Sequence, residues 1–316
     1  MSQESQDLVG RFAEYEIVGE QLYFACENGN LEEIQEVAHE KRELFDIAIN
    51  WTNSNEEEKT PLCIACEKGN VRYLLSNRKI DVNKESYFDE TPLHLACDAG
   101  QVEIVKTLLD DRRVDVNRVN REDWTPLYFA CFHGNIEIVK LLLNEISIEV
   151  NKKDNVGRTP FYIACEHGHM DVVKLLINDQ RVDINQETND NETPYFLACL
   201  DGDIELVKLL LNDKRVDINK ADNDIRTPFF IACQEGYLEI IKQMLVSGRE
   251  IDQALKDHNG KSAIDIARQN YEQEKEIEES EAKKIYLNII ELLESFERDP
   301  YKMRIKLRIE LGFAGK

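Results

Sequence analysis

The sequence lacks any long hydrophobic run. No stretch approaches the roughly 18 apolar residues that a membrane-spanning helix needs, and the opening MSQESQDLVGRFAEYE has neither the basic region nor the apolar core of a secretory signal. We therefore expect a cytoplasmic protein, with the nucleus as an alternative, and no membrane partner. Thiols stay reduced in these compartments, so we expect no disulfide bridges.

Basic side chains are also scarce. The 316 residues contain 39 Lys and Arg against 62 Asp and Glu, which gives a formal net charge of −23. Generic binding to nucleic acid needs clusters of basic side chains that contact phosphates, so this balance argues against a nucleic-acid partner. An acidic surface keeps a protein soluble and can attract basic partners.

What is present is an internal repeat. Its Thr-Pro pairs recur every 34 residues, at Thr91, Thr125, Thr159, Thr193 and Thr227, and a further pair begins at Thr60. Thr is typical of a helix N-cap, and Pro is tolerated at the first helical position. A glycine that suits a helix C-terminus follows each first helix: Gly29, Gly69, Gly100, Gly134, Gly168, Gly202 and Gly236.

Each repeat then continues into a second amphipathic helix and a polar loop. In one copy the apolar residues of this helix run from Ile136 to Leu143 at helical spacing. One such unit cannot bury its apolar face alone, whereas a stack of units can. The sequence therefore predicts an all-α solenoid of helix-turn-helix units with projecting loops or short hairpins.

The segment TPLHLACDAGQVEIVKTLL (91–109), followed by VDVN (114–117), resembles the ankyrin repeat. The resemblance covers roughly residues 19–270 in about eight copies, with degenerate copies at both ends. It differs from the family pattern at the loop tip, where Gly survives only as Gly157 and Gly260. Asp89, Asp123 and Asn191 tolerate the left-handed conformation that this position needs, but Ile225 tolerates it poorly. We therefore expect the tip at Ile225 to be reshaped.

We divide the chain into an N-terminal extension (1–18), a repeat solenoid (19–298) with an acidic insertion (271–284) in its last repeat, and a basic C-terminal segment (299–316). Asp299-Pro300 and Gly312 favour a helix in this last segment, whereas its alternating apolar residues favour a strand. We favour a short helix that docks on the last repeat. Its four basic residues either pair with the acidic solenoid or bind a separate partner: Lys302, Arg304, Lys306 and Arg308.

Two short motifs resemble chemical sites. Cys63 and Cys66 have the spacing of a thiol redox motif or of half a zinc site, but Cys66 is one of seven cysteines at a single repeat position. Stacked helices lie about 8–10 Å apart, too far for disulfides, and zinc typically takes four ligands. Gly260-Lys261-Ser262 resembles the end of a phosphate-binding loop, but Leu255 stands where that loop needs Gly. We assign no catalytic residue, metal or cofactor.

The resemblance implies a monomeric, non-enzymatic protein that binds a protein or peptide in a groove of loop tips and inner helices. Residues that vary between copies are then the candidates for binding. We predict an apolar anchor of Tyr87, Phe88, Trp124 and Phe132 that takes a basic partner, although Tyr87 and Phe88 equally fit a role in stabilising a loop. The other predicted binding residues are Glu90, Glu122, His133, Val156, Arg158, Glu192, Ile225 and Arg226.

An adaptor, scaffold or inhibitory subunit is the leading interpretation. The alternative is a targeting or substrate-recognition subunit of an enzyme complex, such as a ubiquitin ligase or a kinase or phosphatase regulator. An autonomous enzyme is a third reading, and it would need a pocket of perturbed ionisable groups. The resemblance also implies that the loop asparagines are sites of hydroxylation: Asn83, Asn117, Asn151, Asn185 and Asn219.

Overall fold

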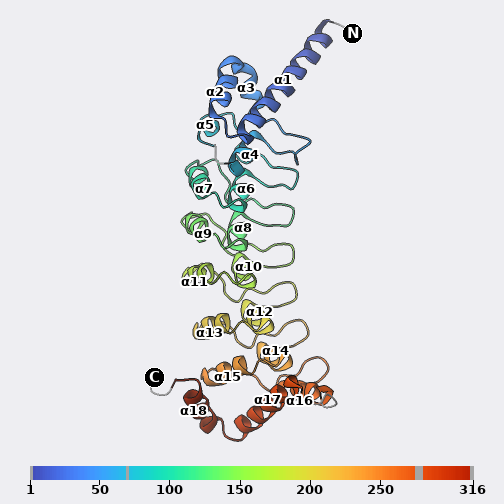
Figure 1. Cartoon of the computed structure of the whole chain (residues 1–316), viewed down its shortest axis with the longest axis vertical. Helices are drawn as coiled ribbons and strands as arrows, with labels where there is room; N and C mark the ends of the chain where they lie inside the picture. The colour runs from blue at the N-terminus through green and yellow to red at the C-terminus, as the bar shows by residue number, and fades with distance from the viewer. Residues whose placement is uncertain (1–2, 69–70, 275–279, 314–316) are drawn as a thin grey trace. The chain divides into compact units, whose positions relative to one another are not determined.

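The computed structural model describes residues 3–68, 71–274 and 280–313, and this part of the chain contains eighteen helices and no named strand (Figure 1). It divides into two compact units, residues 1–155 and 156–316. We describe each unit by itself. None of the helices in the described part of the chain is both long enough and apolar enough to cross a membrane.

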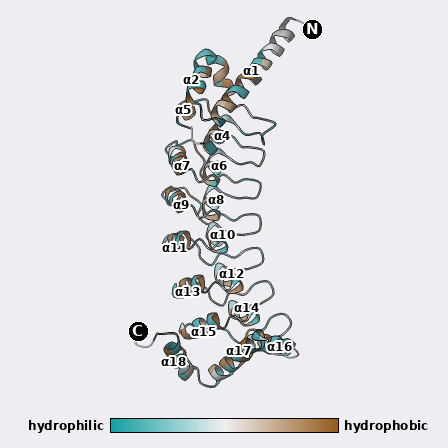
Figure 2. Cartoon of the chain, in the orientation of Figure 1, coloured by the Kyte–Doolittle hydropathy of each residue, from teal (hydrophilic) through white to brown (hydrophobic). Residues whose placement is uncertain are grey.

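The first unit consists of α1 (Gln3–Glu27), α2 (Leu31–Glu40), α3 (Arg42–Ala48), α4 (Pro61–Lys68), α5 (Arg72–Leu75), α6 (Pro92–Asp98), α7 (Val102–Leu109), α8 (Pro126–Phe132) and α9 (Ile136–Leu143). The first helices pack in the order α1, α4, α6, α8, and the outer helix α7 packs on α9. The outer helices carry both hydrophobic and hydrophilic residues, as expected for helices that are buried on one side (Figure 2).

The second unit consists of α10 (Pro160–Glu166), α11 (Met170–Asn178), α12 (Pro194–Asp201), α13 (Ile204–Asn212), α14 (Pro228–Glu235), α15 (Leu238–Val246), α16 (Ala263–Gln273), α17 (Glu281–Arg298) and α18 (Pro300–Glu310). Here α10, α12, α14 and α16 pack in sequence, and α13 packs on α15. The predicted all-α repeat architecture is therefore confirmed.

The predicted helix signals act as expected. The hydroxyl of each Thr in the Thr-Pro pairs accepts a hydrogen bond from the third helical residue, as Thr125 does from the Tyr128 N–H at 3.1 Å. The glycines that follow the first helices have positive φ angles, for example +69° at Gly134 and +73° at Gly202. Gly69 lies outside the described residues. Ser262 caps α16 and pairs with Asp265, which agrees with its interpretation as a helix cap.

The N-terminal helix is longer than the repeat pattern requires. The expected boundary between residues 18 and 19 lies inside α1, which runs unbroken from Gln3 to Glu27. Repeat one lacks Thr-Pro, so no capping residue marks the start of its first helix, and the helix continues upstream. The following connection contains the additional helix α3, and the outer helix of repeat two, α5, is reduced to four residues.

The C-terminal segment is a helix, α18, that packs on α15 and α17. Asp299 caps it by accepting a hydrogen bond from the Lys302 N–H at 3.0 Å, and Pro300 fills its first position. α17 packs on α16 as the second helix of the last repeat. Within the acidic insertion, residues 275–279 lie outside the described residues.

The expectation of a reshaped loop tip at Ile225 is wrong. Ile225 has a φ angle of +62°, close to the +60° of Asn191 and the +61° of Asp123. Its N–H donates to the Asp222 oxygen at 3.1 Å, and the Asp222 N–H donates to the Arg226 oxygen at 3.1 Å, as in the other tips. Two backbone hydrogen bonds hold the turn. They keep the backbone of Ile225 in a conformation that a β-branched residue rarely adopts.

Candidate functional site

The varying positions form paired contacts along the inner side of each repeat. In three repeats the residue before Thr contacts the residue eight positions later, at the end of the first helix. In the first unit, Lys59 Nζ lies 2.9 Å from Glu67 Oε1, and the rings of Trp124 and Phe132 have centroids 5.5 Å apart. In the second unit, Arg158 lies 3.1 Å from Glu166. We call these paired positions the inner strip of each unit.

Trp124 forms the aromatic part of the inner strip in the first unit. Its indole stacks on the Tyr128 ring at a centroid distance of 4.8 Å and meets the Phe129 ring edge-on at 5.2 Å. Tyr128 is buried, and its hydroxyl donates to Asp154 Oδ2 at 2.9 Å. Trp124 and Phe132 are half-buried. The indole is thus held in a fixed orientation while part of it meets solvent.

Acidic side chains lie in the preceding repeat of the same strip. Burial, and then the negative charge of Asp98, raise the pKa of Glu90 above its ordinary value. Asp98 Oδ1 lies 2.7 Å from Nε2 of His133, which is exposed at the end of α8. The charge of Lys59 acts on the pKa of Glu90 in the opposite direction, so a cation near Glu90 favours the charged form of this carboxyl.

Tyr87 and Phe88 form a separate aromatic pair at the loop tip. Their rings meet edge-on at 5.3 Å, and the Arg121 guanidinium lies 4.2 Å from the centre of the Tyr87 ring. The two side chains are 49% and 38% exposed. The ring contacts therefore place the four predicted anchor residues in two groups rather than one. The side chain of Glu122 is exposed, and its backbone oxygen accepts a hydrogen bond from the Asn155 N–H at 3.2 Å.

The inner strip of the second unit is polar. Glu192 Oε2 accepts a hydrogen bond from the Tyr162 hydroxyl at 3.3 Å, and burial raises the pKa of this carboxyl. Arg226 donates to Asp222 Oδ2 from Nη2 at 2.6 Å and from Nε at 2.8 Å. Burial also raises the pKa of Asp201, and the charge of Glu166 adds to this effect.

Two predicted binding residues of the second unit lie at loop tips. Val156 is 47% exposed and Ile225 is 44% exposed. Val156 stands where other repeats carry Phe88, Glu122, Asp190 and Asp224, and Ile225 stands where they carry Asp89, Asp123, Gly157 and Asn191. Arg158 is held by Glu166 as described above, so its charge is partly compensated.

The loop asparagines connect neighbouring repeats. Asn117 Nδ2 donates to the Ser147 oxygen at 2.7 Å, and its Oδ1 accepts from the Glu149 N–H at 2.8 Å. Asn83, Asn185 and Asn219 make equivalent pairs of hydrogen bonds within their units. Asn50 does the same with Lys79 and Asp81. The sequence reasoning missed Asn50, although IAIN (47–50) matches the end of VDIN.

The cysteines show no feature of a reactive site. All eight are buried and unbridged, and burial raises the pKa of seven of the thiols, to about 12 for Cys26. Cys63 occupies the helical position that His94 takes in the next repeat, and its N–H donates to the Thr60 hydroxyl at 3.1 Å. Within the described residues, no group of three or more His, Cys, Asp or Glu side chains could hold a metal ion.

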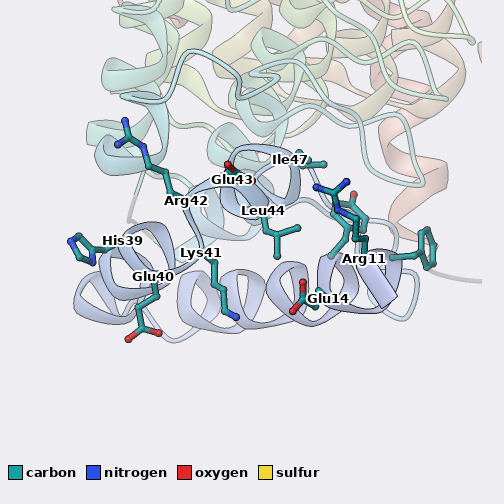
Figure 3. Close-up of a pocket in the computed structure, with 11 residues that line it drawn as sticks. Arg11, Glu14, His39, Glu40, Lys41, Arg42, Glu43, Leu44 and Ile47 are labelled. Carbon is teal, nitrogen blue, oxygen red and sulfur yellow. The ribbon is translucent and has the colours of Figure 1, made fainter. Parts of the chain in front are cut away.

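A cavity of about 840 Å³ lies between α1 and α3 in the first unit. Figure 3 shows Arg11 and Glu14 approaching it from α1, and Leu44 and Ile47 from α3. Its lining mixes charges of both signs with apolar side chains, and none of the predicted binding residues lines it.

Comparison with known proteins agrees with this architecture. A family model described as ankyrin repeats (3 copies) matches residues 22–120, 82–154, 112–188, 146–222, 180–257 and 196–277. Among solved structures, the chain is similar to the ankyrin repeat domain of Bcl-3, described as a unique member of the IkappaB protein family. The two are 21% identical with a TM-score of 0.61, over 67% of this chain and 95% of that chain. This likeness shows the fold alone.

The chain is also similar to the human ASB11 ankyrin repeat domain. The identity is 26% and the TM-score is 0.56, over 72% of this chain and 97% of that chain. No curated protein matches the sequence significantly.

Proposed function

The chain belongs to the ankyrin-repeat family, and on this premise we propose that it is a non-enzymatic module that binds a protein or peptide through its inner strip. Ankyrin repeats are in general protein-binding modules. The observation that carries the proposal is the inner strip of the first unit, where Trp124 and Phe132 are half-buried and in contact with each other, and Glu90 and Asp98 occupy the same positions one repeat earlier. The role as adaptor, scaffold or inhibitory subunit, the monomeric state and the cytoplasmic or nuclear location are parts of this proposal.

The chemistry of the strip suggests which partner segment it takes. The face of Trp124 and the ring of Phe132 offer a rigid apolar contact, and aromatic side chains dominate binding energy at protein interfaces. Glu90 and Asp98 lie one repeat earlier and favour a positive charge. We therefore propose a partner segment with an apolar residue next to Lys or Arg. The basic residue would gain an ion pair with Glu90 and a cation–π contact with the indole.

Affinity capture with quantitative mass spectrometry tests the proposal. We expect Trp124→Ala with Phe132→Ala, and separately Glu90→Lys with Asp98→Lys, to lose a common partner that the unmodified chain captures. Tyr87→Ser with Phe88→Ser is the matched aromatic control and should retain that partner. Circular dichroism checks that each variant keeps its helical content, because Trp124 also packs on Tyr128 and Phe129.

The same experiment separates the two roles that the sequence left open. A catalytic subunit that remains with the captured complex would favour a targeting or substrate-recognition subunit over an adaptor. Retention of every partner by both inner-strip variants would contradict binding at this surface.

A further inference from the structure

The helix α18 packs one face on α15 and α17 and has one face open to solvent. On the inner face, Leu307 is 1% exposed, and Arg304 Nε donates to the Leu245 oxygen at 3.3 Å. Glu310 pairs with Lys242 of α15. Figure 1 shows α18 beside α15 and α17 at the end of the second unit. The helix is thus anchored through one side only.

The open face of α18 carries an apolar ridge. Tyr301, Ile305 and Ile309 are 78%, 44% and 63% exposed, and they are spaced four residues apart. Residues at this spacing lie above one another on a helix, so the three side chains form a continuous ridge opposite Leu307.

Basic residues border this ridge on both sides. With about 100° of rotation per residue, Lys302 and Lys306 lie along one border of the ridge and Arg308 lies along the other, whereas Arg304 is turned inward to the Leu245 oxygen. The helix therefore contains four basic residues against the single acid Glu310, which Lys242 already pairs. In a chain with a net charge of −23, α18 stands out as a basic helix.

We propose that α18 binds an anionic lipid surface, with the Tyr301–Ile305–Ile309 ridge among the headgroups and the basic borders next to the lipid charges. A helix that lies in the plane of the interface needs no membrane-spanning run. We expected no membrane partner because the sequence lacks such a run. Binding at the lipid surface is compatible with that lack. Acidic residues elsewhere in the chain are screened beyond about 8 Å at physiological salt.

The charge pattern favours a lipid surface over a second copy of this chain. A second copy that paired ridge to ridge would bring Lys302 and Lys306 close to the basic borders of its partner, which is unfavourable. A flat anionic surface needs only the open face, and Tyr is well suited to the membrane–water boundary.

Vesicle flotation with the full chain tests the proposal. We expect binding to phosphatidylcholine vesicles with about 30% phosphatidylserine and little binding to phosphatidylcholine alone. Lys302→Gln with Lys306→Gln should weaken binding roughly 25-fold, because each basic residue near an anionic surface contributes about a factor of five. Ile305→Ser with Ile309→Ser should abolish it, whereas Ile146→Ser, at a site 98% exposed in the first unit, should leave it unchanged.

The replaced side chains are exposed, so all variants should keep the thermal unfolding of the unmodified chain. A Tyr301→Trp variant should shift its fluorescence to shorter wavelength on binding. Three results would each overturn the proposal: no binding to anionic vesicles, binding that Ile305→Ser with Ile309→Ser leaves intact, or concentration-dependent self-association through α18 in the absence of lipid. Retention of lipid binding by the inner-strip variants would show that this site is independent of the proposed protein-binding function.

Discussion

The Nε2 atom of His94 lies 3.0 Å from the backbone oxygen of Trp124 in the next repeat. The other ring nitrogen, Nδ1, accepts the Thr91 N–H at 3.0 Å, which fixes the neutral ring with its proton on Nε2. The side chain is fully buried, and burial lowers its pKa from 6.5 to about 4. One imidazole therefore caps α6 and also connects two repeats of the first unit.

We expect this histidine to make the first unit sensitive to acid. The unfolded chain binds a proton near pH 6.5, whereas the folded chain does so only near pH 4. The contribution of His94 is therefore complete above pH 6.5 and is lost as pH falls toward 4, by about 3 kcal/mol in total. Urea unfolding between pH 7 and pH 4.5 measures it against His94→Phe, the residue found at Phe196 and Phe230. Equal pH dependence of both proteins would contradict this role.

Replacing a glycine in α1 by Ala should change stability in the direction opposite to that expected from helix propensity. Replacing Gly19 by Ala should favour the helix by about 1 kcal/mol, but the added Cβ would lie 2.2 Å from Cγ of Trp51. Trp51 is buried and donates from Nε1 to Glu16 at 2.8 Å, so it cannot move freely. We expect Gly19→Ala to destabilise the chain by about 1 to 3 kcal/mol. The matched control is Gly10→Ala, whose Cβ would meet no atom within 4 Å and should be neutral or stabilising.

The left-handed conformation of Ile225 should cost stability. A β-branched residue with a φ angle of +62° is strained by about 1 to 3 kcal/mol. We expect Ile225→Asn to raise the free energy of unfolding by about 1 kcal/mol, and Asn191→Ile to lower it, because Asn191 has the same conformation. Urea unfolding checks both. If the Ile225 side chain contacts the partner, Ile225→Asn should also weaken partner capture. A stabilised variant that captures the partner normally would count against a binding role for Ile225.

The repeat period predicted most of the fold. Thr caps, Pro at the first helical position and Gly at the helix end act locally, so their spacing determined the helices from α6 to α15 before any contact was known. The length of the N-terminal helix escaped prediction because repeat one lacks Thr-Pro, which would mark the start of its first helix. The tip at Ile225 was mispredicted because its two backbone hydrogen bonds outweigh the preference of a single side chain.

The candidate site was predicted less completely than the fold. Variation between copies singled out Trp124 and Phe132, and the structure brings their rings together. It did not reveal that Tyr87 and Phe88 form a separate pair, because the distance between loop tip and inner strip depends on how neighbouring loops stack. Nor did it reveal that the pKa of Glu90 is raised, because this depends on burial and on Asp98.

The asparagine bridges predict both a stability effect and a chemical one. Asn117→Ala removes two inter-repeat hydrogen bonds and should lower the free energy of unfolding by about 1 to 2 kcal/mol. We also propose that Asn117 and its equivalents can be hydroxylated, which mass spectrometry would detect as one added oxygen. Because the carboxamide is engaged on both sides, an asparaginyl hydroxylase should modify the folded chain more slowly than the urea-unfolded chain. Equal rates would contradict this protection.

The paired cysteines of α4 should react only when the chain opens. A redox-active Cys-x-x-Cys motif needs a thiol that is exposed and has a lowered pKa. Cys63 and Cys66 are fully buried, and burial raises the pKa of both thiols. We therefore expect a maleimide at pH 7 to label neither thiol in the native chain and all eight cysteines in urea. Any slow labelling of the native chain, measured by intact mass, should follow the rate at which the chain opens locally. Rapid labelling of Cys63 alone would instead restore the redox interpretation.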